Sequence, residues 1–162
     1  PSCRIARMSS VSPVMHSAWL IALAGLLAVP AHAQEAACTQ VARELNARLA
    51  TPVDSRELAE TLGTLAATGR LPDRFVTKRQ AREAGWQPGK SLWQTDGLAG
   101  KSIGGDRFGN REHRLPAGRW QEADLDYRGG KRNAKRLVFA GSGRRFVTVD
   151  HYQSFTEVPP CR

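Results

Sequence analysis

The sequence predicts an α+β protein in which helices precede an antiparallel β-sheet. In the first half of the chain, apolar residues recur at helical spacing. From Gly97 onward, glycines separate short runs that are rich in β-branched and aromatic residues. Helices followed by strands with short connections favour an antiparallel sheet over a βαβ repeat.

Three helices are expected in the first half. Apolar residues four apart lie on one face of a helix over residues 41–49, and Thr51-Pro52 ends it. Asp54 or Ser55 can cap a second helix that runs to about residue 67. A short third helix over 77–85 begins with capping-box spacing and ends at a glycine.

The second half is expected to hold five strands joined by short turns. Gly141-Ser142-Gly143 has the composition of a hairpin loop between two of them. The predicted strands are 102–108, 119–125, 135–140, 144–149 and 153–158.

Residues 1–33 predict a secretory signal peptide. Two arginines precede an uncharged apolar run over 18–29, and Ala31-His32-Ala33 has the pattern of a cleavage site. The alternative is an uncleaved membrane anchor, which the shortness of the apolar run disfavours. Because the chain opens with Pro1, Met8 and Met15 are candidate starts, with the earlier residues as an upstream extension. We therefore expect a single domain over 34–162, exported to the periplasm or medium and free of the membrane.

The expected domain is basic. Removing the signal takes away two arginines and no acids, which leaves 22 basic against 15 acidic residues, a net charge of +7. This surplus suits a polyanionic partner such as nucleic acid, anionic lipid or acidic cell-wall polymer, and charge does not distinguish among them.

Two cysteines remain in the expected domain, one near each end. In an oxidising compartment, Cys38 and Cys161 most simply form one disulfide, with two free thiols as the alternative. No third cysteine or cluster of histidines accompanies them, so we expect no metal site.

His151 is a candidate proton carrier. It is one of two histidines in 34–162, the other being His113, and histidine titrates close to neutral pH. The alternative is a packed, hydrogen-bonded ring near the end of a strand. Glu122 and Asp124 are two apart in a predicted strand and so share a face, and a dense cationic segment follows at 131–136. An acid, a base and nearby cations suit cleavage of an RNA phosphodiester by its own 2′-hydroxyl.

Four separated blocks of sequence resemble barnase and its relatives, the secreted bacterial guanyl-preferring ribonucleases. The resemblance covers about residues 70–158, in the same order and with similar spacing, whereas the helices before it match in pattern only. The blocks are LPDRFVTK at 71–78, GGDRFGNRE at 104–112, WQEAD at 120–124 and DHYQSFT at 150–156.

The resemblance implies catalytic roles for several residues. Glu122 would be the general base and His151 the general acid, and the roles would reverse when water opens a 2′,3′-cyclic phosphate. Lys78 and Arg132 would contact the scissile phosphate, with Arg136 nearby. The supporting residues would be Asp124, which would hold both arginines by salt bridges, and Asp106.

The resemblance places guanine recognition in the segment Phe108 to Glu112. The Glu112 carboxylate can accept from the two adjacent donors of guanine, while the backbone N–H groups of Asn110 and Arg111 reach its O6. Gly109 stands where relatives often carry serine, which implies a looser loop. Tyr152 would pack against a base or bind phosphate, with a half-buried strand aromatic as the alternative, and His113 is expected on the surface.

The expected function is therefore a metal-independent, cofactor-free endoribonuclease, active as a monomer, that cleaves single-stranded RNA 3′ to guanosine. An intracellular inhibitor like barstar, presenting acidic groups, would be its natural partner. The alternative is a secreted basic module that binds nucleic acid or another polyanion with a decayed site. The intact set of Glu122, Arg132 and His151 disfavours it, because binding alone needs only cations and stacking surfaces.

Overall fold

The computed structural model describes residues 36–162, so the predicted signal peptide and its cleavage site lie outside the described residues. The helices are α1 (Cys38–Asn46), α2 (Ser55–Thr68) and α3 (Lys78–Glu83), with a short 3-10 helix at Leu92–Gln94. The strands are β1 (Phe75–Val76), β2 (Ser102–Phe108), β3 (Trp120–Asp124), β4 (Arg136–Ala140), β5 (Arg145–Thr148) and β6 (Thr156–Glu157). Within 36–162, no helix combines the length and apolar character needed to cross a membrane.

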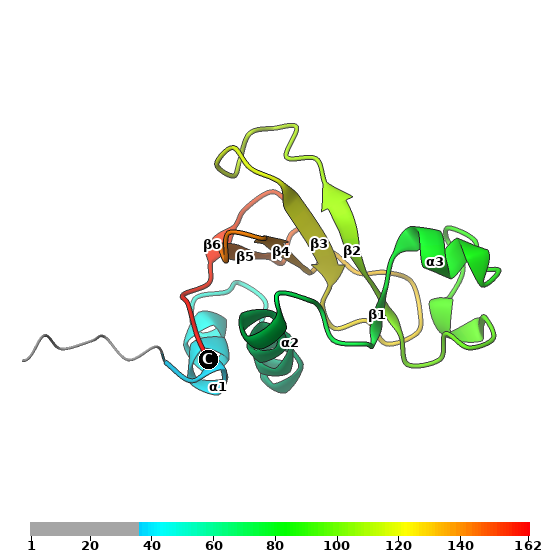
Figure 1. Cartoon of the computed structure of the whole chain (residues 1–162), viewed down its shortest axis with the longest axis horizontal. Helices are drawn as coiled ribbons and strands as arrows, with labels where there is room; N and C mark the ends of the chain where they lie inside the picture. The colour runs from blue at the N-terminus through cyan, green and yellow to red at the C-terminus, as the bar shows by residue number, and fades with distance from the viewer. Residues whose placement is uncertain (1–35) are drawn as a thin grey trace, which may run out of the picture. The chain divides into compact units, whose positions relative to one another are not determined.

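The six strands of the described chain form one sheet in sequence order (Figure 1). Successive strands from β2 to β6 pair antiparallel with one another, and the two-residue β1 pairs in parallel with the other edge of β2. The predicted α+β class with helices before an antiparallel sheet is therefore confirmed. The sequence pattern missed β1, and it began the last strand about three residues too early, because residues 153 and 154 belong to the turn over 150–154.

Local sequence signals explain where the helices begin and end. The Asp54 side chain accepts from the backbone N–H groups of Arg56 and Glu57 at the start of α2, and Gly69 ends that helix in a left-handed conformation with φ 69°. The predicted capping box of Thr77 and Gln80 is present at α3. α1 starts and ends about three residues earlier than predicted.

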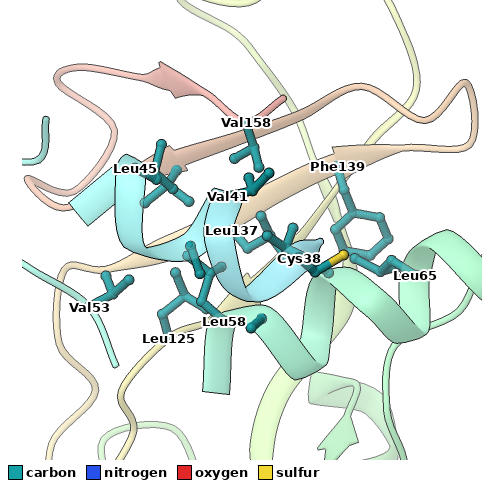
Figure 2. Close-up of a cluster of buried hydrophobic side chains, with 14 of the residues drawn as sticks. Cys38, Val41, Leu45, Val53, Leu58, Leu65, Leu125, Leu137, Phe139 and Val158 are labelled. Carbon is teal, nitrogen blue, oxygen red and sulfur yellow. The ribbon is translucent and has the colours of Figure 1, made fainter. Parts of the chain in front are cut away.

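The main core lies between the two long helices and one face of the sheet. Figure 2 shows side chains of α1 and α2, including Val41, Leu45, Leu58 and Leu65, among Leu125, Leu137 and Phe139 from the sheet side. The predicted disulfide between Cys38 and Cys161 is confirmed, and both cysteines are buried in this core. It therefore ties the start of α1 to the C-terminal end of the chain.

Strand alternation sets the position of the candidate site. Ala123 of β3 faces the helices, so Glu122 and Asp124 point to the opposite face of the sheet. On that face a smaller cluster packs around Trp120, Val138 and Phe146. The two candidate carboxylates therefore lie beside a buried apolar cluster on the face of the sheet opposite α1 and α2.

Candidate active site

An open cleft of about 760 Å³ brings the predicted guanine-recognition segment together with Glu122 and Tyr152. The loop after β2 forms one side, and the turn before β6 contributes Tyr152 and Phe155. The lining residues are Arg107, Phe108, Gly109, Asn110, Arg111, Glu112, Arg114, Glu122, Tyr152 and Phe155.

Glu122 is a buried carboxylate, 7% exposed, whose two oxygens are both hydrogen-bonded. Lys78 Nζ donates to Oε1 at 2.9 Å, and the Tyr152 hydroxyl donates to Oε2 at 2.6 Å. Burial acts to raise the pKa of Glu122, but the bonds from Tyr152 and Lys78 outweigh it and the pKa falls below its ordinary value. Glu122 is therefore ionised at neutral pH, as a proton acceptor must be.

Lys78 reaches Glu122 because its backbone is fixed at the start of α3. Its N–H donates to Asp106 Oδ2 at 2.9 Å, so this carboxylate of β2 sits at the first turn of the helix. β2 is irregular between Gly104 and Asp106, and Gly105 has φ 91°. This bulge redirects the end of β2, where Asp106 holds Lys78.

Asp124 holds two of the predicted arginines. Its carboxylate is 3% exposed and accepts from Arg132 Nε at 2.6 Å and Nη2 at 2.7 Å. Arg136 Nε lies 2.9 Å from Asp124 Oδ1 as an ion pair, without the alignment of a hydrogen bond. The bond from Asp124 raises the pKa of Arg132, and the nearby Glu122 carboxylate adds to this effect. Both guanidinium groups are thus fixed as cations beside the general-base candidate.

His151 lies in the connection between β5 and β6 and not within a strand, which corrects its interpretation as a strand histidine. It is exposed in the turn before β6 with φ 58°, and Tyr152 follows with φ 72°. The alternative of a packed strand histidine is therefore wrong for the described structure. The His151 backbone N–H donates to Ala134 O at 3.2 Å, which joins the turn to the segment that carries Arg132.

Asp150 organises this turn, a role that the strand interpretation overlooked. Its carboxylate accepts from Thr148 Oγ1 and from the backbone N–H groups of Gln153 and Ser154 at 2.9–3.0 Å, and from Ser154 Oγ at 2.5 Å. Burial acts to raise the pKa of Asp150, but these bonds lower it to about 2. The spacing of Asp150 and Ser154 was the sequence feature that could have predicted a turn stabilised by side-chain hydrogen bonds.

Tyr152 also lies in this turn, so the alternative of a strand aromatic is wrong. Its ring stacks on Phe108, with centroids 5.2 Å apart and planes 27° apart, and the His151 ring lies 5.0 Å from it. Burial and the neighbouring Glu122 carboxylate raise the pKa of Tyr152, so its hydroxyl stays protonated as a donor. Tyr152 thereby connects the predicted guanine-recognition segment, the His151 turn and Glu122.

The loop between β2 and β3 is closed by one amide side chain. Asn110, with φ 43°, donates from Nδ2 to Leu115 O at 2.7 Å and accepts from Leu115 N–H at 3.0 Å. The exposed Glu112 carboxylate accepts from Arg114 Nε at 2.7 Å, and Arg114 Nη1 donates to Gln153 O at 2.6 Å. Arg114, which the motifs did not indicate, therefore links the predicted guanine site to the His151 turn. His113 is exposed.

Comparison with known proteins identifies the family. A family model described as ribonuclease matches residues 59–159. The chain belongs to the barnase-like ribonuclease family. Over 92 residues it is 49% identical to proteins named ribonuclease from Bacillus intermedius and Bacillus pumilus, covering 55% of this chain and 56% of each relative. A ribonuclease from Heyndrickxia coagulans is 48% identical over 92 residues, 55% of this chain and 84% of that protein.

The matches cover part of this chain and part of its relatives. The aligned region spans little more than half the length of the two Bacillus ribonucleases. The family match begins within α2, so it reaches further toward the N-terminus than the four sequence blocks do. The ribonuclease family thus accounts for the sheet, the cleft and most of α2.

Proposed function

We propose that this ribonuclease-family protein is a secreted, metal-independent endoribonuclease that cleaves single-stranded RNA 3′ to guanosine. The observation that carries the proposal is the ionised Glu122, held by Lys78 and Tyr152 in a cleft that also contains the Glu112 loop. A binding surface does not require a buried carboxylate among cations, because a phosphate backbone is attracted by the cations alone.

The proposed reaction has two steps. Glu122 accepts the proton of the 2′-hydroxyl, whose oxygen attacks the phosphorus, while His151 donates a proton to the departing 5′-oxygen. The product is a 2′,3′-cyclic phosphate. In the second step His151 accepts a proton from water, the water oxygen attacks the cyclic phosphate, and Glu122 returns a proton to the 2′-oxygen.

The cations are proposed to stabilise the charge on the pentacoordinate phosphorus. Arg132 and Lys78 would contact the phosphate oxygens, with Arg136 behind them. Because Asp124 already orients Arg132, little reorganisation is needed when the phosphate arrives. All proton transfers use side chains of the protein, so the proposal requires no cofactor.

Guanine would be selected by Glu112, with Phe108 and Tyr152 nearby as aromatic surfaces. The carboxylate accepts from N1–H and the exocyclic amine of guanine, and the backbone N–H groups of Asn110 and Arg111 would reach O6. Adenine has an acceptor at N1, which a carboxylate repels. Glu112→Gln replaces one acceptor by a donor, so it should lower turnover of GpN dinucleotides by roughly 100-fold and leave ApN unchanged.

The disulfide fits an oxidising compartment, which supports the proposed export of this family member. We further propose that it acts as a monomer and that a producing cell protects its own RNA with a barstar-like inhibitor. An acidic inhibitor surface would match the cations of the cleft.

The direct test replaces His151 while keeping its backbone conformation. Asn tolerates a positive φ, so His151→Asn removes the proton carrier without forcing the turn to change. It should lower GpN transesterification by about 10²–10⁴-fold, the usual contribution of a general acid. His113→Asn, at φ 50°, is the matched control and should retain full activity. Activity should also survive EDTA, and a strict divalent-ion requirement would contradict the mechanism.

A further inference from the structure

A second groove, of about 810 Å³, borders the candidate cleft. Its lining contains two arginines and no carboxylate. The lining residues are Gly105, Arg107, Arg119, Trp120, Gln121 and Gly141. Its charge therefore suits an anion.

The β2–β3 register places the two arginines on one face of the sheet. Arg107 lies directly opposite Gln121, and Arg119 is two residues before Gln121, so Arg107 and Arg119 are diagonal neighbours. This face is the reverse of the one that carries Glu122. Both arginines are exposed, and within residues 36–162 neither side chain makes a hydrogen bond or ion pair. Two like charges held side by side without a carboxylate are mutually unfavourable until an anion binds between them.

The groove and the candidate cleft are adjacent, because Arg107 lines both. β1 pairs with β2 at Ser102 and Ile103, and the backbone N–H of Lys78 at the start of α3 binds Asp106, so within the described chain only the end of this edge, at Arg107 and Phe108, lies beyond both elements. The loop between β2 and β3 projects at the end of the sheet away from α1 and α2 (Figure 1). A flexible polyanion can therefore pass around this end of the edge from one face to the other.

We propose that this groove binds the phosphates of RNA nucleotides that flank the nucleotide in the cleft. The proposal rests on the proposed ribonuclease function and adds a subsite to it. Arg107 would hold the strand as it leaves the cleft, and Arg119 would hold a phosphate further along. Longer RNA would then bind more tightly than a dinucleotide, through contacts remote from the reacting atoms.

The test uses an RNA octanucleotide whose single guanosine is 2′-deoxy, so that it cannot be cleaved. Its binding is measured by fluorescence anisotropy over a range of salt concentrations. The double variant Arg107→Gln/Arg119→Gln loses two phosphate contacts. The slope of log K against log salt should therefore become shallower by about 1.4, and binding should weaken roughly tenfold at 0.1 M salt. Arg119→Gln alone should produce about half of the change in slope. Arg48→Gln/Lys90→Gln removes the same charge from exposed positions outside both cavities and should leave the slope almost unchanged.

Turnover of a GpN dinucleotide tests the cleft without the second groove. Arg119→Gln should leave this turnover unchanged, because Arg119 lines the second groove and not the cleft. An unchanged salt slope in the double variant, or an equal change in the control, would overturn the subsite. A wild-type protein that cleaves no RNA would instead contradict the proposed function, and the binding measurement would still test the groove. Binding of anionic lipid vesicles but not of the octanucleotide would also overturn the proposal.

Discussion

The hydroxyl of Tyr152 donates a 2.6 Å hydrogen bond to Oε2 of Glu122, and so joins the turn before β6 to the centre of β3. Lys78 holds the other carboxylate oxygen from α3. Three segments that are distant in sequence therefore fix one carboxylate and together keep its pKa low despite its burial.

Removing the Tyr152 hydroxyl should move the acidic limb of the activity profile. The bond favours the ionised form of Glu122, so Tyr152→Phe should raise the pKa of Glu122. The acidic limb of kcat/KM for a GpN dinucleotide should then shift to higher pH, with activity near neutral pH less affected. Tyr127→Phe, which removes a buried hydroxyl from a different cluster, is the control and should not move the limb. An unmoved limb in Tyr152→Phe would contradict Glu122 as the base.

Neutralising Asp124 should destabilise the fold. Arg132 and the 3%-exposed Arg136 would lose the carboxylate that balances their charge. Asp124→Asn should reduce the free energy of unfolding by about 3–5 kcal/mol in urea titrations. Glu83→Gln breaks the exposed pair with Arg79 and should cost less than about 1 kcal/mol. Equal effects of the two substitutions would show that Asp124 does not organise the site.

Asp150 should contribute stability that depends on pH. Its folded-state pKa of about 2 lies below the ordinary 3.8, so its contribution is fully present above about pH 4 and disappears as the pH falls toward 2. Asp150→Asn should lower the free energy of unfolding at pH 7 by on the order of 1 kcal/mol, after allowance for solvent screening. Urea titrations of variant and wild type should converge near pH 2. A constant difference across this range would mean that the charge of Asp150 does not support the turn.

The disulfide should stabilise the fold without affecting the chemistry. It closes a loop with a sequence separation of 123, for which chain entropy predicts a loss of about 5 kcal/mol when it is removed. Cys38→Ala/Cys161→Ala should therefore unfold at much lower urea concentration, while activity per folded molecule stays at the wild-type level. A proportional loss of kcat in fully folded protein would indicate that the core between α1 and the sheet controls the cleft.

Much of the fold could be predicted because its signals are local. Asp54 and Gly69 mark the ends of α2, and the run from Ser102 to Phe108 has the composition of the strand it forms. β1 could not be predicted, because two residues carry no periodicity. The last predicted strand began at residue 153, because the Phe and Thr that follow favour strands, whereas the side-chain bonds of Asp150 hold residues 153 and 154 in a turn.

The candidate site was only partly predictable from sequence, because some of its contacts are local and others join distant loops. The two-residue spacing of Glu122 and Asp124 places them on one face of any strand, so this feature follows from sequence. Arg114 could not be anticipated, because its contacts with Glu112 and Gln153 exist only when Asn110 closes the loop and the His151 turn lies opposite. Contacts between loops depend on tertiary structure that no local pattern specifies.

The most direct test of the central claim is mass spectrometry of the ends that the protein produces on a mixed-sequence single-stranded RNA in the presence of EDTA. Early in the reaction, the account predicts 2′,3′-cyclic phosphates on fragments that end in guanosine, followed by 3′-phosphates. His151→Asn should produce neither. Fragments with 3′-hydroxyl and 5′-phosphate ends, or RNA left uncut, would contradict the account.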